Sequence, residues 1–195
     1  MAIDLLAVLA PLHPVEHAGW RTRGNPDFTP TGIVLHHTAS STRSGPIGSL
    51  GVVIGGRPGI PGPLCNLLIG RDLSLHLVAA NRANHAGADS SIAVAEAAAG
   101  QVNYATKTAK ARGLKDDTVG NRRLFGIEIE NNGINEAWSP GLVDFVGHVC
   151  ALICKAETWT VGHTTLHRNL TARKTDPWGT PGQDWWAAIA HHMTP

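Results

Sequence analysis

GIVLHHTAS, residues Gly32–Ser40, carries the clearest strand signal in the chain and runs directly into polar side chains. The aliphatic run 33–35 begins with two β-branched residues and is bounded by turn residues, which is typical of a buried strand. Such a strand delivers His36, His37 and Thr38 at its carboxyl end. Neighbouring side chains on a strand point to opposite faces, so only one of the two histidines can face a given site.

Outward from this strand, helix and strand patterns alternate. Apolar runs 64–69 and 73–78 flank Gly-Arg-Asp and predict a β-hairpin, while 125–130 alternates as a strand with Glu128 and Glu130 on one side. Other predicted elements are one or two helices in 91–112 interrupted near Gly100, a helix from Ser139-Pro140 to about Glu157, a short strand at 158–161 and a closing helix at 183–193. Gly, Pro and Ser are too dense in 40–63 for a helix, although 50–54 could form a short turn or strand.

These patterns predict an α/β fold, with a central mixed β-sheet flanked by helices. The 195 residues suit one domain, and neither a repeat nor a linker divides them. We therefore expect a single domain over 1–195, with its core at about 19–190.

Composition excludes several classes. The 43% hydrophobic and 16% charged residues are those of an ordinary globular protein, and a net charge of +1 gives no argument for a nucleic-acid partner. No run reaches the roughly twenty apolar residues of a membrane span, and Met1–Leu12 lacks the basic start of a secretory signal. The three cysteines, Cys65, Cys150 and Cys154, are expected to be reduced thiols.

Three segments hold residues whose chemistry fits together: the His36-His37 pair, Glu128, and the stretch 167–176 with His167, Lys174 and Asp176. Two His and one carboxylate can form a catalytic zinc site that leaves a fourth position for water. A Glu beside the ligands could act as general base, and a Lys near the third ligand could stabilise an oxyanion. No compact metal motif such as H-E-x-x-H occurs, so spacing alone is a weak signal.

Five ordered motifs make the signal specific: GIVLHHTAS (32–40), PLCNLLIGRD (63–72), LHLVAANRANHAG (75–87), FGIEIENNG (125–133) and HRNLTARKTDPWG (167–179). Together the chain resembles the type-2 N-acetylmuramoyl-L-alanine amidase family, which also includes the peptidoglycan recognition proteins. Within that family it looks closest to the amidase domains of endolysins from actinobacteriophages, above all mycobacteriophages. The resemblance covers roughly residues 19 to 186.

The resemblance implies one Zn²⁺ per chain, with His36, His167 and Asp176 as the metal ligands. It implies catalytic roles for Glu128 and Lys174, and it places His85 along the substrate groove. Asn131, Arg173 and Trp178 are further candidates for substrate binding.

Several alternatives stay open. His37 competes with His36, Glu130 competes with Glu128, and Arg173 could instead form a structural ion pair. Many relatives have one more residue between the second and third ligands, so His163 could replace His167. Some relatives carry a catalytic Tyr where this chain has Cys65, which leaves the base function to Glu128.

The implied reaction is zinc-dependent hydrolysis of the amide between N-acetylmuramic acid and L-alanine in peptidoglycan, by a phage lysin that degrades its host's wall. A non-catalytic peptidoglycan-binding module on the same fold is the alternative. We expect a monomer with no membrane partner, made in the host cytoplasm and released through a holin's membrane lesion. The chain is expected to be excised from a multidomain endolysin.

Overall fold

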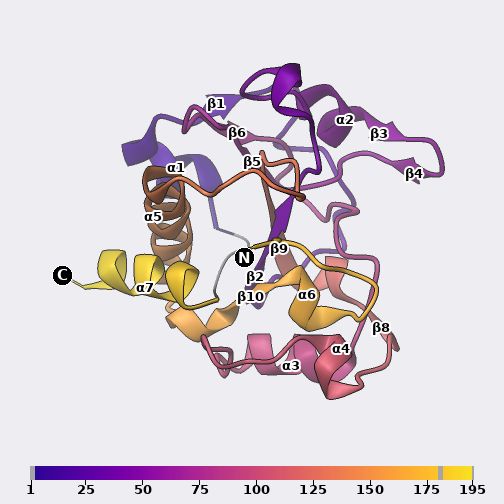
Figure 1. The fold of residues 1–195 in the computed structure, drawn as a ribbon. Helices are drawn as coiled ribbons and strands as arrows, with labels where there is room; N and C mark the ends of the chain where they lie inside the picture. Colours follow the sequence, from indigo (N-terminus) through magenta and orange to yellow (C-terminus); the bar gives the residue numbers. More distant parts are fainter. Residues whose placement is uncertain (1–2, 180–181, 195) are drawn as a thin grey trace.

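A six-stranded sheet forms the centre of the molecule in the computed structural model, which describes residues 3–179 and 182–194 (Figure 1). Its spatial order is β1-β6-β5-β9-β2-β10, and every neighbouring pair is parallel except β5–β6. The bounds are β1 Val15–Glu16, β2 Gly32–His37, β5 Leu67–Ile69, β6 Leu75–Leu77, β9 Leu124–Ile129 and β10 Thr164–Leu166. The predicted mixed sheet is therefore confirmed, and β5–β6 is the predicted hairpin.

Helices cover both sides of the sheet. Figure 1 shows α1 (Leu5–Leu9), α5 (Pro140–Ala156) and α7 (Gly182–Met193) on one side. On the other side lies α6 (His167–Leu170), with α3 (Ser91–Ala98) and α4 (Ala109–Arg112) beyond it. With both faces covered, the central strands are apolar until near their carboxyl ends, and Ile33, Val34 and Leu35 are fully buried.

Shorter elements form the edges of the molecule. Two small antiparallel pairs are β3 (Gly56–Arg57) with β4 (Ile60–Pro61), and β7 (Ala88–Asp89) with β8 (Thr118–Val119). Four 3₁₀ turns are η1 Ala10–Leu12, η2 Thr42–Ser44, η3 Gly120–Arg122 and η4 Val161–His163. Over the described residues, no helix combines the length and apolar composition that crossing a membrane requires.

The predicted helices begin and end close to where sequence placed them. Ser139 caps α5 by accepting a hydrogen bond from the Leu142 amide, and Pro140 fills the first turn. The break in 91–112 is wider than expected, since α3 ends at Ala98 and α4 begins at Ala109. The two ends of the predicted domain, Met1 and Pro195, lie outside the described residues.

Two local predictions are wrong. Residues 158–161 are not a strand: Thr158 has a left-handed φ of 58° as α5 ends, and the strand forms three residues later as β10. Residues 50–54 belong to a short helix, α2 (Leu50–Gly55), rather than a turn or strand. Its Val53 packs against Cys65 and Leu68, so tertiary packing outweighs the surrounding glycines.

Candidate active site

The candidate catalytic residues stand in one row across the sheet. In the parallel pair β2–β9, His36 lies opposite Glu128. In the pair β2–β10, Leu35 lies opposite Leu166, so His167 follows directly beside His36. Strand register therefore brings three chemically active side chains together at the carboxyl ends of parallel strands, where open α/β sheets commonly bind ligands.

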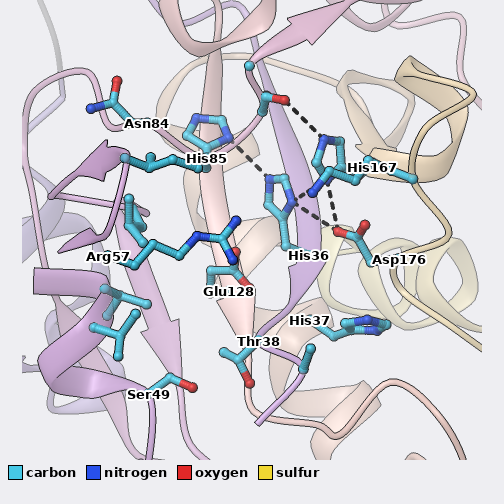
Figure 2. A pocket seen from close by; sticks show the side chains of 18 of the residues that line it. His36, His37, Thr38, Ser49, Arg57, Asn84, His85, Glu128, His167 and Asp176 are labelled. Carbon is cyan, nitrogen blue, oxygen red and sulfur yellow. Dashed lines mark hydrogen bonds and ion pairs between the residues drawn. The ribbon is translucent and has the colours of Figure 1, made fainter.

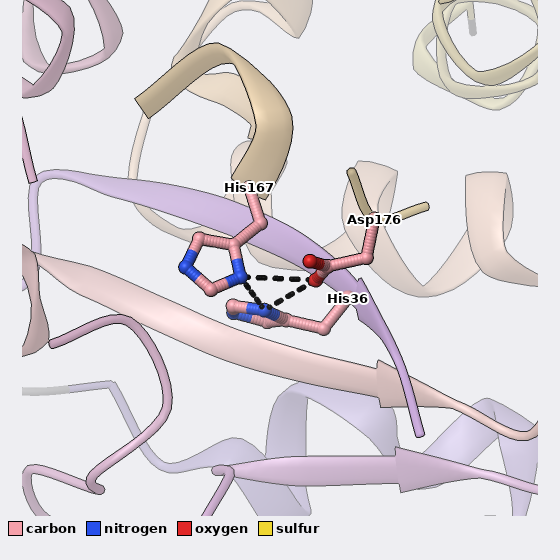
Figure 3. Close-up of side chains that lie close together, drawn as sticks. All are labelled: His36, His167 and Asp176. Carbon is pink, nitrogen blue, oxygen red and sulfur yellow. Dashed lines mark hydrogen bonds and ion pairs between the residues drawn. The ribbon is translucent and has the colours of Figure 1, made fainter. Parts of the chain in front are cut away.

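Asp176 completes a compact group of metal-ligating atoms (Figure 3). His36 Nδ1 lies 2.9 Å from His167 Nδ1, and the Asp176 Oδ2 atom lies 3.1 Å from the first and 2.9 Å from the second. A tetrahedral site with bonds of about 2.0 Å has ligand atoms roughly 3.3 Å apart. The three atoms thus need only small outward shifts to share one metal ion.

Hydrogen bonds on the far side of each ring select the tautomer that a metal needs. His85 Nε2 faces the Leu124 carbonyl at 3.1 Å, and its Nδ1 faces His36 Nε2 at 3.1 Å. Because a carbonyl oxygen only accepts, His85 donates from Nε2, accepts at Nδ1, and leaves the His36 Nδ1 lone pair unprotonated. His167 Nε2 likewise faces the Ala86 carbonyl at 3.3 Å.

Two ring lone pairs and a carboxylate oxygen therefore converge on one point, an arrangement that only a cation or a proton can stabilise. Burial, and then the neighbouring His167, lower the pKa of His36 to about 4. Burial alone would raise the pKa of Asp176, but the close approach of the His167 and His36 rings holds it well below its usual range. Neutral imidazoles with an ionised carboxylate are the forms that bind zinc.

Glu128 stands next to this group without a partner of its own. Its Oε2 atom is buried and has no hydrogen bond within the described residues. Burial, reinforced by the Asp176 charge, raises the pKa of Glu128 to about 8, although Lys174 opposes the shift. A carboxylate in such surroundings is ready to take up a proton.

A cavity of about 960 Å³ opens over the row of residues (Figure 2). His36, Glu128, His167 and Asp176 lie along it, and so do the predicted His85, Arg173 and Lys174. Gly126 makes room for the His85 ring, because an added Cβ would lie 2.4 Å from His85 Cγ. The cavity therefore brings together both predicted catalytic residues and all three predicted metal ligands.

The alternatives to these residues have other partners. His37 points away from the three ligand atoms (Figure 2), and its Nδ1 accepts a hydrogen bond from the Trp178 amide at 3.1 Å. Glu130 is fully buried and pairs with Arg71 at 3.1 Å. His163 accepts a hydrogen bond from the Thr160 amide in η4 and is absent from the metal-ligating group.

The three further residues predicted to bind substrate differ in whether they line the main cavity. Asn131 is 1% exposed, and its amide bonds within its own loop to Glu136 O and Gly133 N, so its side-chain amide is engaged within the loop and Asn131 stays an untested prediction. Arg173 lies along the cavity but also forms the ion pair considered above, with Asp116 at 2.6 Å. Trp178 borders a second cavity, beyond His37, rather than the main one.

Sequence reasoning missed two charged residues here. Arg57 reaches from the β3–β4 hairpin over the cavity toward Glu128 (Figure 2); the turn sequence Gly56–Gly59 was the available signal. Asp89 is fully buried behind His167, and burial raises its pKa to about 6. Cys65 is also buried, and burial raises its thiol pKa well above the usual value, so it cannot stand in for a catalytic Tyr.

The profile of the N-acetylmuramoyl-L-alanine amidase family (Amidase_2) matches residues 25–179, and the chain belongs to this family. No curated protein sequence shows significant similarity to the chain.

Two solved structures share the fold. One is the endolysin N-acetylmuramoyl-L-alanine amidase LysCS from Clostridium intestinale, with 19% identity, a TM-score of 0.53, and coverage of 86% of this chain and 87% of that one. The other is a selenomethionine derivative of AmpD, with 19% identity, a TM-score of 0.56, and coverage of 92% and 99%. At this identity the likeness establishes the fold alone.

Proposed function

We propose that this protein is a zinc-dependent N-acetylmuramoyl-L-alanine amidase that degrades the peptidoglycan of a phage's host. The observation that carries the proposal is the convergence of His36, His167 and Asp176 on one point, beside an unpartnered Glu128. Family membership supplies the bond that is cut, the amide between N-acetylmuramic acid and L-alanine.

The three ligands fit zinc by their chemistry. Two imidazoles and one carboxylate are the donors of many catalytic zinc sites, and they leave a fourth position for water or substrate. When bound, zinc would polarise the substrate carbonyl and lower the pKa of a water molecule to about 7. The lone pairs set by Leu124 O and Ala86 O prepare the two rings for this ion before it arrives.

Glu128 handles the protons of the reaction. It takes one from the attacking water and passes it to the nitrogen of the leaving L-alanine. Its position suits this role, because Glu128 lies opposite His36 in the sheet and its Oε2 atom has no hydrogen bond within the described residues.

Lys174 and Arg57 supply positive charge to the same cavity. The Lys174 ammonium group has no hydrogen bond or ion pair within the described residues, so it can stabilise negative charge on the carbonyl oxygen. Arg57 and Arg173 lie along the cavity where they can bind carboxylates of the peptide stem.

The experiment measures zinc content and the release of L-alanine amino groups from mycobacterial-type peptidoglycan, with and without a chelator. Asp176→Ala should lose both zinc and activity, whereas Glu128→Gln should lose activity and keep zinc. One zinc per chain with chelator-sensitive cleavage is the expected result. Zinc without cleavage would instead favour the wall-binding module, and a chain that binds no zinc would refute the mechanism.

A further inference from the structure

Asp89 is a buried carboxylate that the reaction described above does not use. It is fully buried, and neither of its oxygens has a hydrogen bond within the described residues. Leaving an ionisable group in this condition costs free energy unless a nearby charge stabilises it. His167 is close: its Nε2 atom lies 4.0 Å from Asp89 Oδ1.

The two ring nitrogens of His167 face different surroundings. Nδ1 points to the shared metal position, 2.9 Å from Asp176 Oδ2. Nε2 points the other way, toward the Ala86 carbonyl and Asp89. With Nδ1 on a metal ion the ring proton must sit on Nε2, where a carboxylate attracts it and makes the ring a stronger donor.

The backbone holds Asp89 in this place. Its carbonyl accepts a hydrogen bond from the Asp117 amide at 2.9 Å as β7 pairs with β8. The next residue, Ser90, donates its amide to Leu170 at 2.8 Å, and Leu170 ends the helix that His167 begins. Asp89 and His167 are therefore tied to each other through α6.

Gly120 provides the space for the carboxylate. An added Cβ at Gly120 would lie 2.2 Å from Asp89 Oδ2, closer than any real contact allows. The Arg173 guanidinium forms its ion pair with Asp116 at 2.6 Å and acts on Asp89 only through space. A metal ion held by His167 would add a positive charge on the side of this carboxylate where His167 lies.

We propose that Asp89 is a positioning residue for the metal: it fixes the His167 ring with its proton on Nε2 and strengthens the zinc bond at Nδ1. The inference rests on the proposed function, since it assumes that His167 binds zinc. Neither the family match nor the sequence motifs assign a role to this residue.

Zinc affinity of the full chain tests the proposal, measured by competition with a chromogenic chelator at neutral pH. Asp89→Asn should weaken binding 10- to 100-fold, the usual effect of losing such a partner. Asp117→Asn is the matched control, with the same charge change in the same loop region but a carboxylate bound to Ser91, and its affinity should stay within about twofold of the parent.

Two further measurements separate positioning from a purely structural role. The melting temperature of metal-free Asp89→Asn should equal or exceed that of the parent, because the variant removes an unpaired buried charge. The visible spectrum of the cobalt-substituted protein should shift in Asp89→Asn and not in Asp117→Asn. Gly120→Ala, which displaces the carboxylate but keeps its charge, should also weaken zinc binding, and it serves as the test if Asp89→Asn does not fold.

The outcomes distinguish the two proposals. A parent that binds zinc while Asp89→Asn and Gly120→Ala bind it equally well overturns the role of Asp89 alone. A lowered metal-free melting temperature with unchanged zinc affinity does the same, because it indicates a structural role. A parent that binds no zinc overturns the proposed function and this inference together.

Discussion

Replacing Glu128 by Gln should make the metal-free protein more stable while abolishing its activity. The pKa of Glu128 is raised from 4.5 to about 8 in the folded chain. As pH rises past 4.5 the unfolded chain releases this proton, but the folded chain keeps it until about pH 8. Stability is therefore lost across this window and is level above it. Gln cannot ionise, so the variant avoids the loss.

The size of this stability difference follows from the pH range over which only the unfolded chain has lost the proton. From 4.5 to pH 7 is 2.5 units, and at about 1.4 kcal/mol per unit the parent loses about 3 kcal/mol. The cavity above Glu128 is open to solvent, which screens part of this cost, so we expect a gain of about 2 kcal/mol for Glu128→Gln at pH 7. At pH 5, close to the pKa of the unfolded chain, the increase in the free energy of unfolding of Glu128→Gln should be below about 1 kcal/mol.

Urea unfolding in the presence of a chelator measures this difference at both pH values. Adding zinc should remove the advantage of the variant, because a cation beside Glu128 stabilises the parent's carboxylate. A variant that is less stable than the parent at pH 7, or a difference that does not change with pH, would refute the reasoning.

Three other substitutions test particular contacts. Gly126→Ala would place a Cβ 2.4 Å from the His85 ring and displace it from His36. We expect zinc affinity, measured by chelator competition, and kcat/KM, measured by steady-state kinetics, each to fall about tenfold. Unchanged zinc affinity would mean that His85 does not support His36. Arg71→Met leaves the fully buried Glu130 without its ion-pair partner, so the free energy of unfolding in chemical denaturation should fall by about 3–5 kcal/mol. A fall of less than about 1 kcal/mol would mean that the ion pair is dispensable. Asp176→Ala should abolish the rise in melting temperature that zinc gives the parent, because the variant loses one of the three proposed ligands. A rise equal to the parent's would exclude Asp176 as a ligand.

The fold could be predicted from sequence wherever hydrophobic periodicity was strong. The aliphatic run of β2, the alternating pattern of β9 and the N-cap of α5 each predicted a single type of secondary structure. The predictions at 158–161 and 50–54 were wrong because those segments are shaped by packing and by a left-handed residue, which local patterns do not encode.

For the site, the motifs predicted which residues belong together, and strand register explains why His36, Glu128 and His167 meet. Asp89 could not be predicted in this way. It lies on a two-residue strand with no periodic signal, and its partner His167 is 78 positions away in the chain. Asn131 directly follows β9 in the chain, and its hydrogen bonds within the loop could not be inferred from the sequence either.

The three proposed metal ligands differ in what holds them in place. His36 and His167 stand at the ends of adjacent strands, whereas Asp176 comes from the loop after α6. There the Arg168 amide donates to the Asp176 carbonyl at 2.9 Å, and the Trp178 amide donates to His37 Nδ1 at 3.1 Å. A bound ion would add a link between the Asp176 side chain and the two histidines at the sheet. Limited proteolysis with a trypsin-like protease tests this link. Removing the metal should make the peptide bonds after Arg173 and Lys174 easier to cleave, and restoring the metal should protect them.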